Sequence, residues 1–185
     1  QGIAWGREVV VGAGENWDAF VAEAVSRGLW GIENLSGIPG TVGGAPVQNI
    51  GAYGSEVKEV IAWVEILDRK TNELKKLSNA ECAFAYRDSI FKKSEGKDFI
   101  ITRVAFRLSK VGAPNLAYKD LAAYFARPTR KRSRCGRAGK QAPALAEVRR
   151  AVLHIRARKF PALATHGTAG SFFKNPISRK SNLMR

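Results

Sequence analysis

The sequence predicts an α+β fold, in which several strands pack against a few helices. Segments 61–67 and 99–108 are rich in β-branched residues and alternate between apolar and polar side chains, as half-buried strands do. Segment 144–159 instead repeats its apolar residues at helical spacing. Because 45% of the residues are hydrophobic, the chain has enough apolar side chains to form a core.

The N-terminal part is expected to form a strand and a capped helix. Residues 8–11 are a short β-branched run that ends at Gly12, so they predict a strand that enters a turn. Asn16 is a typical N-cap residue, and Asp18 falls in the first turn of the helix that would follow. Gly28 would end this helix. Its expected buried face consists of Trp17, Phe20, Val21 and Ala24.

The middle of the chain predicts a hairpin and one further strand. Residues 61–67 would form the first strand, the polar segment 68–72 the turn, and residues 74–77 the returning strand. Residues 99–108 would form the further strand.

A later change of composition predicts two domains, one over residues 1–112 and the other over residues 113–185. In the second domain we expect a short helix over 118–125 and a longer amphipathic helix over 144–159. The apolar stripe of the longer helix comprises Leu145, Val148, Val152 and Ile155.

The net charge of +15 suggests a nucleic-acid partner, but the distribution of this charge argues against one. Residues 127–140 contain seven cations and no acid, which leaves +8 for the rest of the chain. The run has no aromatic residue for base stacking and no helical stripe. We expect a solvated basic insert or a local change of reading frame, and an RNA- or DNA-binding arm is the alternative that stays open.

Composition also argues against a membrane segment and a metal site. No run approaches the ~20 apolar residues that a membrane-spanning helix needs. Cys82 and Cys135 lack metal-ligand spacing and indicate a reduced, cytoplasmic compartment. The chain begins with Gln1 rather than Met, so we expect a partial product.

Residues 37–54 are the most informative segment for function. They contain six glycines and two prolines among 18 residues, which excludes a regular helix or strand over most of the segment. The segment is nevertheless apolar and almost uncharged, unlike a solvated linker. It predicts a loop whose backbone N–H groups contact a phosphate or the heteroatoms of a ring. A structural crossover without a ligand is the alternative.

Three further positions are candidates for chemistry. Arg87 lies between aromatic residues and would grip a carboxylate, or else form a surface ion pair with Asp88 or Glu81. Ser171 follows a glycine and precedes two phenylalanines, which allows proton donation or helix capping. Lys159 ends the amphipathic helix, where a cation either complements the helix dipole or binds phosphate.

Taken together, these segments resemble the UDP-N-acetylenolpyruvoylglucosamine reductases, the MurB family of bacterial peptidoglycan synthesis. The resemblance rests on five ordered motifs: GIENLSGIPGTVGGAPVQNIGAYG (31–54), AYRDSIFK (85–92), AYKDL (117–121), IRARKFP (155–161) and GSFFKNP (170–176). It implies part of an FAD-binding domain of the vanillyl-alcohol-oxidase (PCMH) type, followed by the start of a small α+β substrate-binding domain.

The resemblance also implies an activity and its reactants. FAD would be the prosthetic group and NADPH the hydride donor, and reduced flavin N5 would pass hydride to UDP-N-acetylglucosamine enolpyruvate. The product would be UDP-N-acetylmuramate, which makes the family's enzyme an NADPH-dependent UDP-N-acetylmuramate dehydrogenase. The expected protein is cytoplasmic, bacterial and monomeric, with no nucleic-acid, membrane or metal partner.

The motifs carry the family's residue roles onto this chain. Arg87 would stabilise the enolate-like state, and Ser171 would deliver the proton that completes the reaction. Tyr86, Tyr118, Lys159 and Asn175 would hold the substrate, chiefly its diphosphate. The expected cofactor contacts are Gly37, Ile38, Pro39, Gly40, Thr41, Gly43, Gly44, Gln48, Asn49, Gly51, Ala52 and Tyr53.

Two parts of the family pattern do not occur in this sequence. They are the N-terminal glycine-rich loop that binds the FAD pyrophosphate and a catalytic glutamate near the C-terminus. We therefore expect the isolated chain to bind FAD weakly or not at all and to be inactive. An inactive remnant of the reductase is the alternative to a piece of a working enzyme.

Overall fold

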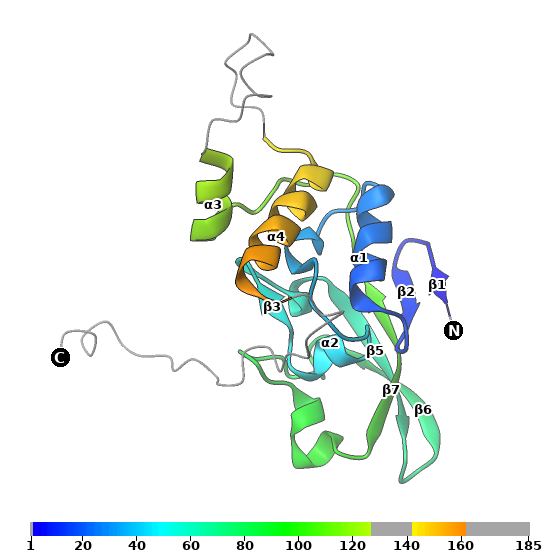
Figure 1. Cartoon of the computed structure of the whole chain (residues 1–185). Coiled ribbons are helices and arrows are strands. Elements are labelled where there is room, and N and C mark those ends of the chain that lie inside the picture. Colours follow the sequence, from blue (N-terminus) through cyan, green and yellow to red (C-terminus); the bar gives the residue numbers. More distant parts are fainter. Residues whose placement is uncertain (1, 127–141, 162–185) are drawn as a thin grey trace, which may run out of the picture.

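A five-stranded antiparallel sheet forms the centre of the computed structural model, which describes residues 2–126 and 142–161 (Figure 1). The strand order is β1-β2-β7-β5-β6, and every neighbouring pair is antiparallel. The strands are β1 (Ile3–Ala4), β2 (Val9–Gly12), β5 (Ile61–Asp68), β6 (Glu73–Ser78) and β7 (Phe99–Phe106). Helices and strands thus pack together as an α+β fold, as the sequence predicts.

The remaining elements lie in the connections between these strands and after the sheet. The helices are α1 (Trp17–Ser26), α2 (Gly44–Val47), α3 (Lys119–Ala126) and α4 (Leu145–Lys159). The short 3-10 turns are η1 (Glu33–Leu35), η2 (Val57–Glu59), η3 (Ile90–Lys92) and η4 (Ser94–Gly96). Strands β3 (Gly51–Ala52) and β4 (Ser55–Glu56) form a separate two-stranded ladder.

Helix α1 forms where the sequence predicts it. The Asn16 side chain accepts a hydrogen bond from the Ala19 N–H at 2.9 Å, which caps the first turn. Phe20 lies fully buried with its ring centroid 5.0 Å from that of Phe106 on β7, so α1 packs directly on the sheet. The Trp17 indole N–H donates to the Leu35 carbonyl at 2.9 Å and thereby fixes the chain that follows α1.

The predicted hairpin is confirmed as β5 and β6, and the further strand as β7. Val64 and Ile66 of β5 point into the core and are fully buried. At the turn, the Asp68 carboxylate accepts the Lys70 N–H at 3.0 Å, as short polar turns commonly require. The sequence analysis did not predict β1, because two residues give no measurable alternation.

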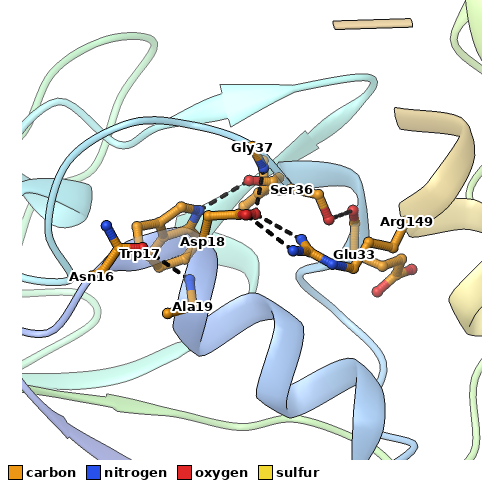
Figure 2. Close-up of polar contacts among 9 residues, drawn as sticks. Asn16, Trp17, Asp18, Ala19, Glu33, Ser36, Gly37 and Arg149 are labelled. Atoms are coloured by element: carbon orange, nitrogen blue, oxygen red, sulfur yellow. Dashed lines mark hydrogen bonds and ion pairs between the residues drawn. The ribbon is translucent and has the colours of Figure 1, made fainter. Parts of the chain in front are cut away.

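Helix α4 packs against α1 and η1, although it belongs to the predicted second domain. The Asp18 carboxylate on α1 receives two hydrogen bonds from the Arg149 guanidinium on α4, at 2.6 and 3.0 Å. The same carboxylate accepts the Gly37 N–H at 2.6 Å (Figure 2). The Asp18 side chain therefore joins α1, α4 and the start of residues 37–54, which we call the glycine-rich loop. The boundary near residue 112 stays a prediction.

Replacing Asp18 with Asn should destabilise the fold. Burial raises the pKa of this carboxyl, but hydrogen bonds from Arg149 and from the Gly37 N–H outweigh burial, so the pKa lies below its ordinary value. We expect a loss of about 1–2 kcal/mol in the free energy of unfolding, less than for a fully buried pair because Asp18 is partly exposed. Urea melts at neutral pH measure this loss.

The matched control is Glu23→Gln, which removes an exposed ion pair with Arg27 and should cost under about 0.5 kcal/mol.

Because the Asp18 pKa is depressed on folding, its stabilisation is present above the unfolded pKa. It is lost as the pH falls through the folded pKa. The difference between wild type and Asp18→Asn should therefore shrink in acid, and a constant difference would contradict this account.

Candidate functional site

The glycine-rich loop has a buried side and an exposed side. Val42, Ala45 and Ile50 point into the core, while Ile38 packs against it half-buried. The exposed residues carry no charge, although the whole chain has a net charge of +15. They are Pro39, Gly40, Thr41, Gly44, Gln48 and Gly54. The exposed side thus offers a neutral surface with one hydroxyl and one amide.

Two of the loop's glycines are explained by packing within the chain. A Cβ on Gly37, whose φ is +71°, would lie 2.9 Å from Leu153 Cδ2 on α4. A Cβ on Gly43 would lie 2.7 Å from the Ala13 Cβ, and the Gly43 N–H donates to the Ala13 carbonyl at 2.9 Å. The N–H of Gly37 is likewise used, by Asp18. A contact of these two glycines with a cofactor stays a prediction.

A depression of about 400 Å³ lies beside the loop. One wall comes from the loop and from the turn between β2 and α1, and the other from the β7 region. The lining consists of small and apolar residues with one lysine: Ala13, Gly14, Thr41, Gly43, Val47, Phe91, Gly96, Lys97, Phe99 and Ile101. The depression is open to solvent, and Thr41 and Lys97 supply its polar side chains.

Arg87 lies in a tight turn that is fastened to the loop. The Ala85 N–H donates to the Asp88 carbonyl at 3.0 Å, and the Asp88 N–H donates back to the Ala85 carbonyl at 3.2 Å. Arg87 has a left-handed φ of +54°. Its Nη2 donates to the Gly51 carbonyl at 2.8 Å, and Lys92 Nζ donates to the Arg87 carbonyl at 3.0 Å. The guanidinium is therefore fixed at one edge of the loop.

The alternative of a surface ion pair for Arg87 receives no support from the two acids considered. The Glu81 carboxylate accepts the N–H and the hydroxyl of Ser78, at 2.7 and 2.6 Å. The Asp88 carboxylate accepts the Ser89 N–H at 3.0 Å. Half-buried Tyr86 places its ring centroid 5.9 Å from the Arg87 Cζ, so the two predicted site residues are neighbours.

Tyr118 and Lys159 lie near Tyr53, at the C-terminal end of the glycine-rich loop. The rings of Tyr53 and Tyr118 meet edge to face with centroids 5.3 Å apart. Lys159 Nζ donates to the Asp120 carboxylate at 2.5 Å, and this bond raises the pKa of the lysine. Burial raises the pKa of Tyr53, so its phenol is neutral at neutral pH.

The structure thus brings Arg87 and Tyr118 to one short stretch of backbone, with Lys159 within electrostatic range of Tyr53 and Tyr118. Gly51 accepts from Arg87, and Tyr53, two residues later, contacts Tyr118. Half-buried Ala52 lies between them. Ser171 and Asn175, and the basic run 127–140, fall outside the described residues.

Sequence analysis missed a clamp formed by two asparagines. Asn34 Nδ2 donates to the carbonyls of Tyr53 and Asn115, both at 2.9 Å, and Asn115 Nδ2 donates to the Gly54 carbonyl at 3.0 Å. This clamp holds the segment before Tyr118 against the loop. Asn34 lies within the quoted motif 31–54, but its partner is 81 residues away and no local pattern identifies it.

The described residues hold no metal-type cluster. Within residues 2–126 and 142–161, no three His, Cys, Asp or Glu side chains are grouped as metal ligands would be. Cys82 is buried, and burial followed by the charge of Glu81 raises the pKa of its thiol to about 12, which disfavours a reactive thiolate. No helix in this part of the chain has the length and hydropathy to span a membrane.

Comparisons with known proteins show what the chain is similar to. Residues 4–78 match a family model described as an FAD binding domain. The UDP-N-acetylenolpyruvoylglucosamine reductase of Cupriavidus pinatubonensis (strain JMP 134) is 48% identical over 169 residues, which cover 91% of this chain and 47% of that protein. The reductase of Pseudomonas fluorescens (strain Pf-5) is 47% identical over 174 residues, covering 93% and 48%.

The fold is also similar to a solved structure. The reductase (MurB) from Thermus caldophilus superposes with a TM-score of 0.54 at 26% sequence identity, covering 84% of this chain and 45% of that one. The chain spans about half the length of the curated relatives it matches. By sequence and by fold, the chain is homologous to about half of the UDP-N-acetylenolpyruvoylglucosamine reductases that it matches.

Proposed function

We propose that this chain forms part of an FAD-dependent reductase that converts UDP-N-acetylglucosamine enolpyruvate to UDP-N-acetylmuramate with NADPH. The observation that carries the proposal is that Arg87 and Tyr118 contact Gly51 and Tyr53, with Lys159 within electrostatic range of both tyrosines. These side chains supply a fixed cation, an exposed aromatic ring and a second cation. Such a set suits a carboxylate and a diphosphate in one ligand.

The residues beside the loop fit FAD. The lining of the depression is small and apolar where a flat ring would lie, and Lys97 adds a positive charge at its rim. Thr41 and Gln48, exposed on the loop, offer polar groups to the cofactor. When bound, FAD supplies the hydride chemistry, taking hydride from NADPH and delivering it to the enolpyruvyl group.

Arg87 has the features of an electrostatic catalyst. Addition of hydride to the terminal enolpyruvyl carbon places negative charge on the neighbouring carbon and its carboxylate. A guanidinium has five N–H donors, and one donor of Arg87 is held by the Gly51 carbonyl. Within the described residues the guanidinium makes no other hydrogen bond, so its remaining donors would bind that carboxylate and lower the energy of the charged state. Ser171 would then give its proton to the same carbon, as the family resemblance implies.

Tyr118 and Lys159 would hold the nucleotide end of the substrate. Lys159 Nζ lies on Asp120 at 2.5 Å, so a diphosphate has to share or displace this carboxylate. Tyr118 is 38% exposed and rests on Tyr53, which leaves much of its ring open to a ligand. Tyr86 and Asn175 complete the proposed substrate contacts. We further propose a cytoplasmic monomer without nucleic-acid or membrane partners.

Arg87 is tested in a chimaera, in which this chain replaces the matched half of the Cupriavidus pinatubonensis reductase. We expect enolpyruvyl-dependent NADPH oxidation by the chimaera, and Arg87→Lys should lower kcat by about 10²–10³-fold with a smaller change in KM. A lysine keeps the charge but loses the planar fork. Stopped-flow or steady-state absorbance of NADPH measures the rates.

The control is Arg107→Lys, because Arg107 is an exposed arginine that pairs with Glu8 away from the loop. Its kcat should stay within about twofold of the unsubstituted chimaera. A flavin-loaded chimaera without enolpyruvyl-dependent turnover would refute the proposed function. Equal kcat values for Arg87→Lys and Arg107→Lys would refute the role of Arg87.

The isolated chain should bind FAD weakly. It spans about half the length of its relatives, so it supplies only a part of the expected cofactor contacts. Titration of the purified 185-residue chain with FAD, followed by flavin fluorescence, measures the affinity. Stoichiometric flavin retained through purification would contradict this expectation. In a separate titration with RNA or DNA, binding that collapses with added salt would favour the basic-module alternative.

A further inference from the structure

Asn49 is fully buried in the glycine-rich loop, with 0% of its surface exposed. Its side chain makes three of the four hydrogen bonds that an amide can form, all of them within the protein. Nδ2 donates to the Glu56 carboxylate and to the Ala85 carbonyl, both at 3.0 Å, and Oδ1 accepts the Lys58 N–H at 3.1 Å. Both donors are therefore used, and burial closes the second lone pair of Oδ1 to a cofactor. The resemblance alone assigned Asn49 to the cofactor contacts.

These bonds form part of a seam between the loop and the turn that carries Arg87. Ser89 Oγ donates to the Val47 carbonyl at 2.6 Å, Asn49 donates to Ala85, and Arg87 donates to the Gly51 carbonyl. On the loop, the bonded residues are every second one: Val47, Asn49 and Gly51. Their partners on the turn are Ser89, Ala85 and Arg87, in that order. Asn49 is therefore the central of three ties.

Gly51 shows how closely Arg87 fits this seam. A Cβ at Gly51 would lie 3.1 Å from Glu56 Cγ and 3.6 Å from Arg87 Nη1. Glu56 is in turn held by Asn49 and by Lys58 Nζ at 2.8 Å. Asn49 thus contacts both neighbours of Gly51. It binds the Glu56 side chain directly, and it holds Arg87 through the Ala85 carbonyl in the same turn.

We propose that Asn49 is a positioning residue for Arg87 and not a contact to FAD. Its amide holds the 85–88 turn on the loop, so that the Arg87 guanidinium lies on the Gly51 carbonyl before any ligand binds. The chemical consequence, a preorganised site for the substrate carboxylate, rests on the proposed function.

The test uses the 185-residue chain labelled with ¹⁵N-arginine. NMR measures rotation of the Arg87 guanidinium, whose signal is assigned by its loss in Arg87→Lys. In Asn49→Gly we expect this rotation to become about tenfold faster, because loss of the tie frees the Arg87–Gly51 bond. Glycine is chosen because φ is +45° at Asn49, a conformation that glycine adopts without strain.

The matched control is Asn72→Gly. Asn72 has a similar φ of +56° but lies exposed in the turn between β5 and β6. The same replacement there changes the same backbone preference and should leave Arg87 rotation unchanged. If Asn49→Gly fails to fold, Asn49→Asp decides the question, since it keeps the acceptor for Lys58 and loses both donors.

An unchanged Arg87 signal in a folded Asn49 variant would overturn the proposal. So would a selective loss of FAD affinity in that variant while Arg87 rotation stays as in wild type. Neither readout requires turnover. An inactive chimaera would therefore contradict the proposed function alone.

Discussion

The arrangement of the site depends on the hydrogen bonds that the Asp18 carboxylate accepts. It accepts two hydrogen bonds from Arg149 and one from the Gly37 N–H, and so joins α1, α4 and the start of the glycine-rich loop. The Arg149 side chain is only 15% exposed, so the pair is shielded from solvent more than a typical surface ion pair. Because α4 ends at Lys159, this tie also sets where the Lys159 cation lies.

The glycine-rich loop both packs against the rest of the chain and presents an exposed surface. Its amino-acid composition does not show which residues do which. Its buried residues fasten it to the core, to Ala13 and to the Arg87 turn. Its exposed residues form a neutral surface beside the depression. Glycine serves both sides, since Gly37 and Gly43 are needed for close packing within the chain while Gly40 and Gly44 lie exposed.

The site joins segments that belong to different predicted domains. Arg87 is held through Gly51, and Tyr118 rests on Tyr53 beside the clamp formed by Asn34 and Asn115. The proposed carboxylate site and the proposed diphosphate site therefore share one short backbone segment. This arrangement couples the position of the proposed reacting group to that of the proposed anchor, because a shift of residues 51–53 would move both.

The sequence by itself predicted the main helices and strands and the resemblance to the family. Helix α1, helix α4, the hairpin β5–β6 and strand β7 are encoded by local periodicity, by the Asn16 cap and by turn residues, which act over a few positions. The motifs 31–54 and 85–92 identified the family and drew attention to Arg87.

Only the tertiary structure decided what several of these residues contact. Asp18 meets Arg149 across 131 positions, and Asn49 meets Ala85 across 36, so no local pattern contains either pair. The same glycine or asparagine suits a ligand contact or an internal tie, and burial distinguishes the two. Burial depends on how distant segments pack, which is why the family resemblance assigned Asn49 to the cofactor while only the fold shows it buried and bonded to Glu56, Lys58 and Ala85.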